Sequence, residues 1–451
     1  MDTPPTSLER ALARLLRPFA NVDPQEAISA VVMTLIVFLL LTAYYLLKTA
    51  REPLILLQGG AEVKSYAAAG QVVLLLGVVR AYSAVARRVG RMKLLAIVYL
   101  FFTSNLLVFA ALARTNLHIG VAFFLWVGVF NYTAVAQFWS FAADIYTPDQ
   151  GKRLFAILGI GSSVGAVAGA GIAKNLASFG PQALMFAAAV LLVVCVSLIA
   201  WVERRERQSE ATARSLGAPQ PAPEHPLSHE SAFHLLVRDK YLVVVAIMTL
   251  LLSWCNSSGE YILDRTLLAS VEAARAQGMN PQAFVAAFKA SYFGWFNLVG
   301  VLLQLFAVSR IIAKLGVRNA LLFLPAIAGL GYGLVSIAPV LALIRIVKIA
   351  ENSLDYSLQN TARQALYLVT SRVEKYVGKT TVDTLIVRIG DVMSAIVVLI
   401  GSRIGLPVSG FAAINVVLIV GWMTCIFFIG SEFQRRSKET PDDIAAEPVE
   451  A

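Results

Sequence analysis

The sequence is poor in charge and in the residues of catalytic and metal-binding chemistry. Only 15% of its 451 residues are charged, and it has three cysteines and four histidines. The cysteines (Cys195, Cys255 and Cys425) lie in apolar runs without CxxC spacing, so we interpret them as small apolar residues. The histidines fall in predicted loops, and no Ser/His/Asp cluster, phosphate-cradling loop or metal motif appears. These absences argue against an enzyme, and no cofactor or metal is expected.

Long apolar runs make up most of the chain. Hydrophobic residues account for 58% of it, and the mean hydropathy is +0.70. Windows of about 20 residues can cross a bilayer, and a lipid-exposed strand would instead need a closed barrel with period-2 alternation. We therefore predict an all-α polytopic membrane protein. Its twelve predicted transmembrane helices lie at 27–49, 65–86, 94–113, 118–145, 153–174, 181–202, 241–264, 284–312, 319–338, 340–368, 380–402 and 409–431. No signal-peptide cleavage site precedes the first span, which is expected to remain a helix.

The net charge of +10 follows the predicted topology. Most Lys and Arg fall in the termini and every second loop, and positive charge favours the cytoplasm. Both termini are therefore predicted to be cytoplasmic, in a bacterial inner membrane. A basic patch for RNA is the alternative; we expect the lipid bilayer as partner and no nucleic acid. The opposite side holds eight basic residues: Arg51, Lys64, Arg114, Lys174, Arg265, Arg275, Lys289 and Arg403.

A charged stretch rich in Pro, Ala and His divides the apolar runs into two sets of six. It is predicted to be a cytoplasmic linker, 203–240, between an N-terminal half, 27–202, and a C-terminal half, 241–431. The N-terminal segment, 1–26, includes "LERALARLLRPF", which suits an amphipathic helix on the inner leaflet. The cytoplasmic tail, 432–451, ends in "KETPDDIAAEPVEA", which is acidic and predicted to be disordered.

The two halves carry short echoes of each other. "YLLK" at 45–48 corresponds to "YILD" at 261–264, and "ARRVGRMKLL" after the second span corresponds to "AKLGVRNALL" after the eighth. Twelve spans, a central linker and these echoes resemble the major-facilitator arrangement of six plus six pseudo-symmetric helices. Such a protein has its substrate site near the midplane between the halves.

The tenth span, 340–368, carries a polar stripe. Its members step by three or four residues, which places them on one helical face: Arg345, Lys348, Asn352, Asp355, Gln359 and Arg363, with Glu351 beside them. Ionisable groups in a span cost about 2.5–3.5 kcal/mol each on insertion scales, so they usually face a cavity or one another. The stripe either lines a transport cavity or forms a structural ladder of ion pairs.

The fourth span, 118–145, shows a milder version of this stripe. Thr133, Gln137, Ser140 and Asp144 share one face, and Asn131 lies just before them. The fourth and tenth spans are equivalent in a six-plus-six repeat, which favours the cavity interpretation. Packing of helices through hydroxyl groups is the alternative.

Other ionisable groups lie in or beside spans. Arg80 either snorkels to the interface or presents its guanidinium to an anion. The candidate gating acids are Glu52, Glu260, Asp264, Glu351, Asp355, Asp383 and Asp391. Several of them could pair across the halves with Lys48, Arg51, Arg345 or Lys348, and pairs of this kind can gate access by breaking in one state and forming in the other.

A glycine ridge marks the fifth span, 153–174. Gly161, Gly165 and Gly169 in "GIGSSVGAVAGAG" form a repeated GxxxG pattern, which lets helix backbones approach closely. Packing is the simpler interpretation. A related glycine-rich stretch is found in antiporters, but it usually contains a proline that is absent here.

Four stretches together resemble the ATP:ADP antiporter family of nucleotide transporters: "YYLLKTAREPLIL", "SFAADIYTPDQGKRLFAILG", "LLQLFAVSRIIAKLGV" and "NTARQALYLVTSRVEKYVGKTTVDTLIVRIGD". The resemblance implies a twelve-helix fold and nucleotide exchange. Lys48 matches the family's lysine in its first-span motif. The family's Pro-Thr-Lys-Glu falls on residues 361–364, where Arg363 keeps the charge and Gln364 loses one. Gly378, Lys379 and Asp383 match the family's Gly-Lys and following Asp.

The sequence also departs from that family. The early acidic residue of the fourth span has no counterpart near 126–131, and the family's late Pro-Leu-Asp is replaced by Leu-Val-Thr at 368–370. Abundant Ala and Arg are typical of a free-living, high-GC bacterium, which has little reason to import ATP. The resemblance therefore transfers the architecture better than the substrate, and a homologue that moves another anion is an open alternative.

The stretch at 48–53 places three charges at the end of an apolar run. Lys48, Arg51 and Glu52 either meet the outer side of the cavity or snorkel at the interface before Pro53 ends the helix. Since Arg80 and Arg363 have no acid within four residues, we predict that they bind the substrate anion together with Lys48. The full candidate set for substrate is Lys48, Arg51, Arg80, Arg345, Lys348, Arg363, Lys379 and Arg388; the polar cavity residues are Asn131, Gln137, Asn352 and Gln359.

The sequence thus predicts a secondary transporter, active as a monomer, that moves an anionic and phosphorylated metabolite by alternating access. A nucleotide exchanged as in ATP/ADP antiport is the first candidate. A flippase for an anionic lipid would use the same cationic cavity with a lateral opening, and a non-transporting membrane scaffold is a third class.

Overall fold

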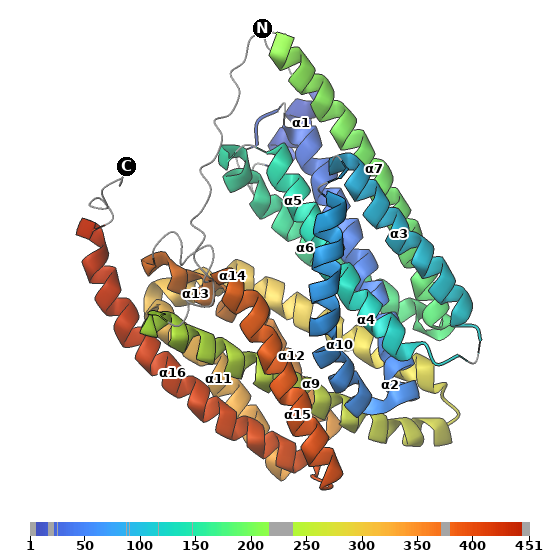
Figure 1. Cartoon of the computed structure of the whole chain (residues 1–451), viewed down its shortest axis with the longest axis vertical. Coiled ribbons are helices and arrows are strands. Elements are labelled where there is room, and N and C mark those ends of the chain that lie inside the picture. The colour runs from blue at the N-terminus through green and yellow to red at the C-terminus, as the bar shows by residue number, and fades with distance from the viewer. Residues whose placement is uncertain are drawn as a thin grey trace. The chain divides into compact units, whose positions relative to one another are not determined.

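The computed structural model describes residues 6–16, 22–24, 26–86, 88–89, 91–115, 117–146, 148–215, 238–370 and 379–443, and these form helices without any strand (Figure 1). In the first half the α-helices are α1 (Ser7–Leu16), α2 (Ala27–Ala86), α3 (Arg91–Leu112), α4 (Gly120–Phe130), α5 (Ala136–Ile145), α6 (Pro148–Leu176) and α7 (Pro181–Ser215). In the second half they are α9 (Lys240–Ala276), α10 (Pro281–Phe306), α11 (Val308–Ile337), α12 (Leu341–Leu354), α13 (Asn360–Ala365), α14 (Lys379–Thr381), α15 (Val387–Arg403) and α16 (Val408–Asp443).

Ten helices of the described part are long and apolar enough to cross a membrane. The predicted class, an all-α polytopic membrane protein, is confirmed. Helix α2 is counted once among these ten, although it covers two of the predicted spans. The predicted tenth span, which is polar, is not among them. The number twelve itself stays a prediction.

Gly60 divides α2 into two segments. Its φ of 83° lies in the region that glycine adopts without a Cβ penalty, so the chain can turn there between two helical runs. Pro53 lies inside the first run, and the helix continues past it. The expectation that Pro53 ends the helix is therefore wrong; in a membrane span, neighbouring helices compensate for the hydrogen bond that proline removes.

Two predicted loop regions are partly helical. Helix α7 continues into the predicted linker as far as Ser215, and residues 216–237 lie outside the described residues. Helix α16 continues to Asp443, so residues 438–443 are helical and not disordered as predicted. Both helices outrun their apolar stretches because helix propagation needs only backbone hydrogen bonds once a packed span has nucleated it.

Three π-helical turns interrupt polar spans. They are η1 (Asn131–Val135) between α4 and α5, η3 (Asp355–Gln359) between α12 and α13, and η6 (Val382–Ile386) between α14 and α15. Turns of this kind are rare and frequent at functional sites. Two of them fall in the fourth and tenth spans, which are equivalent in the predicted repeat.

The chain packs as two compact units. Unit 1 contains residues 1–59, 71–223 and 274–297, and unit 2 contains 60–70, 224–273 and 298–451. Most of each unit comes from one half of the sequence. However, the start of the second α2 segment belongs to unit 2, and the end of α9 with the first half of α10 belongs to unit 1.

In unit 1 the glycine ridge of α6 packs directly on α2. A Cβ at Gly161 would lie 2.6 Å from Thr34, one at Gly169 would lie 2.7 Å from the Thr42 carbonyl oxygen, and one at Gly165 would overlap the Phe38 carbonyl. The Thr42 hydroxyl also lies 3.2 Å from the Gly165 carbonyl oxygen. The packing interpretation of the GxxxG pattern is confirmed.

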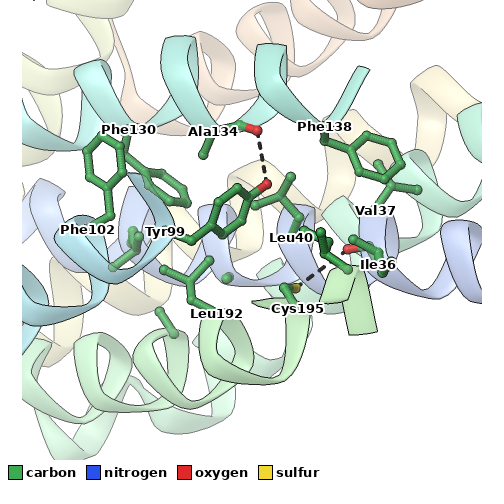
Figure 2. Packing of buried hydrophobic residues seen from close by; sticks show 14 of the residues in the cluster. Ile36, Val37, Leu40, Tyr99, Phe102, Phe130, Ala134, Phe138, Leu192 and Cys195 are labelled. Carbon is green, nitrogen blue, oxygen red and sulfur yellow. Dashed lines mark hydrogen bonds between the residues drawn. The ribbon is translucent and has the colours of Figure 1, made fainter. Parts of the chain in front are cut away.

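The apolar core of unit 1 includes one residue of the first π-turn, Ala134. Helices α3 and α7 run side by side (Figure 1), and the Tyr99 hydroxyl of α3 donates to the Ala134 carbonyl of η1 at 3.1 Å (Figure 2). Phe102 and Phe130 pack edge-to-face beside it, with ring centroids 5.2 Å apart. A carbonyl in the π-turn thus finds a partner on a neighbouring helix.

Unit 2 has its own close helix contacts. Helices α11 and α16 run side by side (Figure 1), and Asn415 of α16 donates to the Cys255 carbonyl of α9 at 3.2 Å. A Cβ at Gly390 of α15 would lie 2.8 Å from the Leu250 carbonyl of α9. These contacts hold α9 against α15 and α16.

Candidate functional site

In unit 1, Lys48 lies against three aromatic rings. Its Nζ is 4.4 Å from the centre of the Phe293 ring, 5.2 Å from that of Tyr45 and 5.4 Å from that of Phe296. The phenylalanines come from α10, and the Tyr45 hydroxyl donates to Asn297 of the same helix at 3.0 Å. A partly buried ammonium on aromatic faces is stabilised by cation–π attraction. The resulting surface combines one positive charge with flat apolar rings.

Glu52 lies one helical turn beyond Lys48, between two cations. Its Oε1 accepts from Arg51 at 3.2 Å, and its Oε2 is 3.6 Å from Lys289 Nζ of α10. The Glu52 and Lys289 side chains are only 1% and 0% exposed. Arg51 also stacks on Phe124 of α4, 4.5 Å from the ring centre. Buried charges of this kind in spans are paired and mark transport pathways.

In unit 2, the start of the second α2 segment is tied to α9 by two polar contacts. Lys64 Nζ donates to Asp264 Oδ2 at 2.7 Å, and the Tyr261 hydroxyl donates to Glu62 Oε1 at 2.8 Å. Arg265, beside them, donates to the Leu406 carbonyl at 2.8 Å. The two halves of the sequence are thus linked through side chains inside this unit.

The largest buried ionic group of unit 2 centres on Lys348 of α12, which is fully buried. Its Nζ lies 3.0 Å from Glu351 Oε2 and 3.7 Å from Glu260 Oε1, and donates to Asn256 Oδ1 at 2.7 Å. Tyr332 of α11 donates to Glu351 at 2.6 Å.

Gly259 of α9 leaves room for this group. A Cβ there would overlap the Tyr332 hydroxyl. Asn352 extends the group by donating to Glu260 at 3.2 Å. The part of the predicted polar stripe around Lys348, Glu351 and Asn352 therefore faces α9 and α11 and contains ion pairs.

One further ion pair connects the tenth and eleventh spans, and another lies within the eleventh span. Arg363 lies 3.6 Å from Asp383, and Arg388 lies 2.7 Å from Asp391. Asp391 also accepts from Ser257 at 2.6 Å. The prediction that Arg363 lacks an acidic partner is wrong, because Asp383 is twenty residues away in sequence but adjacent in space.

The remaining predicted residues lie in different surroundings. Arg80 is exposed and lies 3.4 Å from the Leu76 carbonyl, so the premise that it is a buried cation is wrong and snorkelling is favoured. Gln137 is buried and donates to the Tyr82 hydroxyl at 3.2 Å. Asn131, Arg345, Asp355 and Lys379 are half-buried, and the side chain of Asp144 lies outside the described residues.

Sequence reasoning missed several partners in these groups. Lys64 and Lys289 were counted with the basic residues of the outer side and not as candidate site residues, although Lys289 lies two turns inside α10 and is fully buried. Tyr332 and Asn256 were not among the predicted site residues. The burial of Lys289 could have been predicted from Pro281, because proline is typical of a helix start and Lys289 lies eight residues further along that helix.

Buried ion pairs in helices that are long and apolar enough to cross a membrane are typical of polytopic membrane transporters. Residues 27–350 match the model of the Major Facilitator Superfamily, and the chain belongs to that superfamily.

The chain is 23% identical over 351 residues to ADP,ATP carrier protein 1 of Chlamydia trachomatis, covering 68% of this chain and 64% of that protein. It is 20% identical over 355 residues to ADP,ATP carrier protein 1 of Chlamydia pneumoniae, covering 69% and 66%. The chain thus spans slightly less than two thirds of the length of these relatives. The resemblance to ATP:ADP antiporters is confirmed as a similarity at low identity.

Solved structures share the fold. The nucleoside transporter NupG matches with a TM-score of 0.58 at 11% identity, over 90% of this chain and 99% of that one. A POT family transporter in complex with a thioalcohol-conjugated peptide matches with a TM-score of 0.62 at 13% identity, over 90% and 96%. At these identities the likeness concerns the fold alone.

Proposed function

We propose that this protein carries an anionic metabolite across the membrane by alternating access, and that a nucleotide is its substrate. The observation that carries the proposal is the position of Lys48. Its ammonium lies inside a span on the rings of Tyr45, Phe293 and Phe296. A cation can hold phosphate oxygens, and the rings beside it form an apolar wall along the bound anion.

Two further features support a nucleotide. Buried lysines recur in both units, at Lys289 and Lys348, and each is matched to carboxylates that neutralise it when no substrate is bound. The similar chlamydial proteins are named ADP,ATP carriers. We therefore propose exchange of nucleotides, with the protein acting as a monomer in a bacterial inner membrane.

Transport assays test the proposal. Purified protein is reconstituted into liposomes loaded with ATP, and uptake of radiolabelled ADP is measured against uptake into empty liposomes. We expect uptake only into loaded liposomes. Lys48→Gln should reduce affinity by roughly 10- to 150-fold, the equivalent of one charge-assisted contact of about 1.5–3 kcal/mol. Lys174→Gln, at an exposed position near the end of α6, is the matched control and should transport normally.

The outcome also separates the alternatives. Uptake of other phosphorylated metabolites but not of nucleotides would keep an anion transporter and reject the nucleotide. Movement of a labelled anionic lipid between leaflets, with no uptake of soluble anions, would indicate a flippase. Absence of all three activities in folded protein would leave a membrane scaffold.

Orientation is tested separately. With both termini cytoplasmic, a cysteine at Ser209 should react with a membrane-impermeant thiol reagent only from inside, and one at Gln277 only from outside. Gln277 is exposed just after α9, so its reaction reports topology without loss of packing. Labelling of Gln277→Cys from the inside would reverse the proposed orientation.

A further inference from the structure

Three polar side chains follow one another at four-residue steps where the tenth span leaves its π-turn. Gln359 ends η3, Arg363 lies on α13, and Tyr367 lies in the short 3₁₀ turn η4 (Leu366–Val369). Residues four apart on a helix share a face. Asp383 of η6 lies opposite, 3.6 Å from Arg363, and Tyr367 is close enough to interact electrostatically with both charges. We call these four residues the polar strip.

Two members of the polar strip are buried and two are half-buried, and several of its polar atoms lack hydrogen-bond partners. Gln359 is 1% exposed and Tyr367 is 2% exposed. Among the residues that the structure describes, no hydrogen bond reaches either amide atom of Gln359, the Nε of Arg363, the hydroxyl of Tyr367 or the Oδ1 of Asp383. Native proteins satisfy nearly all buried polar groups, and leaving one unsatisfied costs about 1–3 kcal/mol. The Asp383 Oδ1 atom still faces Arg363 in the ion pair, and the other four atoms favour a site that a ligand completes.

The charges of the polar strip determine what kind of ligand fits. Arg363 and Asp383 form a pair, so the strip contains one positive charge, one negative charge, and the neutral groups of Gln359 and Tyr367. An isolated phosphate would meet the carboxylate as well as the guanidinium. A neutral group that both donates and accepts hydrogen bonds matches the strip better.

Gln359 narrows the choice further. Its amide places a donor and an acceptor side by side in one plane, and both are available. The matching partner is a planar edge that presents an acceptor beside an N–H group. Glutamine pairs in this way with the exocyclic amine and the adjacent ring nitrogen of adenine.

We propose that the polar strip binds the edge of the nucleobase, with Gln359 as the residue that determines base specificity. This inference rests on the proposed nucleotide substrate and adds to it the site that recognises the base.

Binding measurements on the full-length protein in nanodiscs test this assignment with ATP, purine riboside triphosphate and inorganic triphosphate as probes. Purine riboside triphosphate differs from ATP only in lacking the exocyclic amine. We expect the wild type to prefer ATP over this analogue by roughly tenfold, as for loss of one good base contact. Gln359→Leu should weaken ATP binding by more than roughly tenfold and weaken binding of the analogue less, because the analogue retains only the ring nitrogen as a partner for Gln359. The preference for ATP should therefore be lost.

Gln364→Leu is the matched control. Gln364 lies on the same helix but makes an exposed contact with Asn360 at 3.4 Å, so the preference for ATP should survive its replacement. Gln359→Met repeats the test with an unbranched side chain of similar length in case Gln359→Leu unfolds, with thermal unfolding recorded for each variant. The comparison of ATP with its analogue on the wild type requires no variant at all.

The possible failures are distinguishable. If the wild type binds none of the nucleotides, the proposed function fails and this inference fails with it. If the wild type binds both nucleotides equally, or if Gln359→Leu and Gln359→Met keep the preference, the base assignment alone is overturned. If Gln359→Leu instead keeps the preference for the amine but no longer distinguishes ATP from 3′-deoxyadenosine triphosphate, that result would assign the strip to the ribose and would also overturn the base assignment.

Discussion

The Tyr261 hydroxyl donates to the Glu62 carboxylate at 2.8 Å, although the two residues are 199 positions apart in sequence. One turn along α9, Asp264 accepts from Lys64. Tyr45, at the equivalent position of the first half, donates to Asn297 of α10. The "YLLK" and "YILD" echoes therefore have related roles, since each tyrosine reaches a helix from the other half of the sequence.

The Lys64–Asp264 pair should stabilise the fold, and exchanging the two residues for each other should preserve much of that stability. Asp264 is 2% exposed in its side chain, and removing one partner of a buried pair typically costs about 3–5 kcal/mol. We expect Lys64→Asp and Asp264→Lys each to lower the unfolding temperature in detergent. The double exchange should recover at least half of that loss. Additive losses in the double variant would show that the two charges do not stabilise each other.

Replacing one member of the Lys348–Glu351 pair should lower the free energy of unfolding more than replacing both members. Lys348→Met leaves Glu351 buried with Tyr332 as its donor among the described residues, and Glu351→Leu leaves the Lys348 ammonium close to Glu260. We expect each single variant to be destabilised by about 3–5 kcal/mol and the double variant by clearly less. Chemical denaturation of the four proteins in mixed micelles measures this, and equal or larger loss in the double variant would contradict it.

Close packing of α6 on α2 should make Gly165 intolerant of any side chain. A Cβ there overlaps the Phe38 carbonyl, and backbone must shift to accept it. We expect Gly165→Ala to destabilise the protein by about 1–3 kcal/mol, as overpacking does. Gly171→Ala is the control two residues beyond the ridge, because no atom lies within 4 Å of its Cβ position. Thermal unfolding that is unaffected by Gly165→Ala would contradict the close packing.

Helix α1 should loosen in acid. Its first turn forms a capping box in which Thr6 N–H donates to Glu9 Oε2 at 2.9 Å and Glu9 N–H donates to Thr6 at 3.2 Å. The hydrogen bond from the Thr6 backbone, helped by Arg205 at 3.0 Å, holds the pKa of Glu9 below its ordinary value of 4.5. Because the folded pKa is the lower one, this stabilisation is present above pH 4.5 and is lost as the pH falls through the folded pKa.

Hydrogen exchange of residues 7–16 measures this dependence. Exchange should be slow at pH 7 and, corrected for intrinsic rates, faster well below pH 4.5. Glu9→Gln should show the fast behaviour at both pH values. Protection that is independent of pH in the wild type would show that the carboxylate does not hold α1.

Much of the architecture could be predicted from local pattern. Apolar length located the spans because the bilayer imposes it, and the GxxxG ridge indicated a close helix contact. The polar stripe of the tenth span was recognisable because its spacing is a property of one helix. Its members Lys348, Asn352 and Arg363 all make polar contacts with other helices.

The partners of those residues could not be predicted in the same way. Lys289 meets Glu52 and Lys64 meets Asp264 only after the chain has folded, and no local spacing encodes contacts over 200 positions. The π-turns were also missed, because one extra residue in a helical turn leaves no clear mark in composition. Arg80 misled the prediction because a lone arginine in an apolar run looks the same whether it is buried or snorkels.

The exchange of helical segments between the two units bears on whether either half can exist alone. A fragment that ended in the linker would retain Glu52 but lose Lys289, and would retain Lys64 but lose Asp264. Glu52 would lose one of its two cations and Lys64 would lose the Asp264 carboxylate, and lost charge partners are costly in an apolar setting. The N-terminal half expressed by itself is therefore expected to be degraded, and to accumulate only when the C-terminal half is made in the same cell.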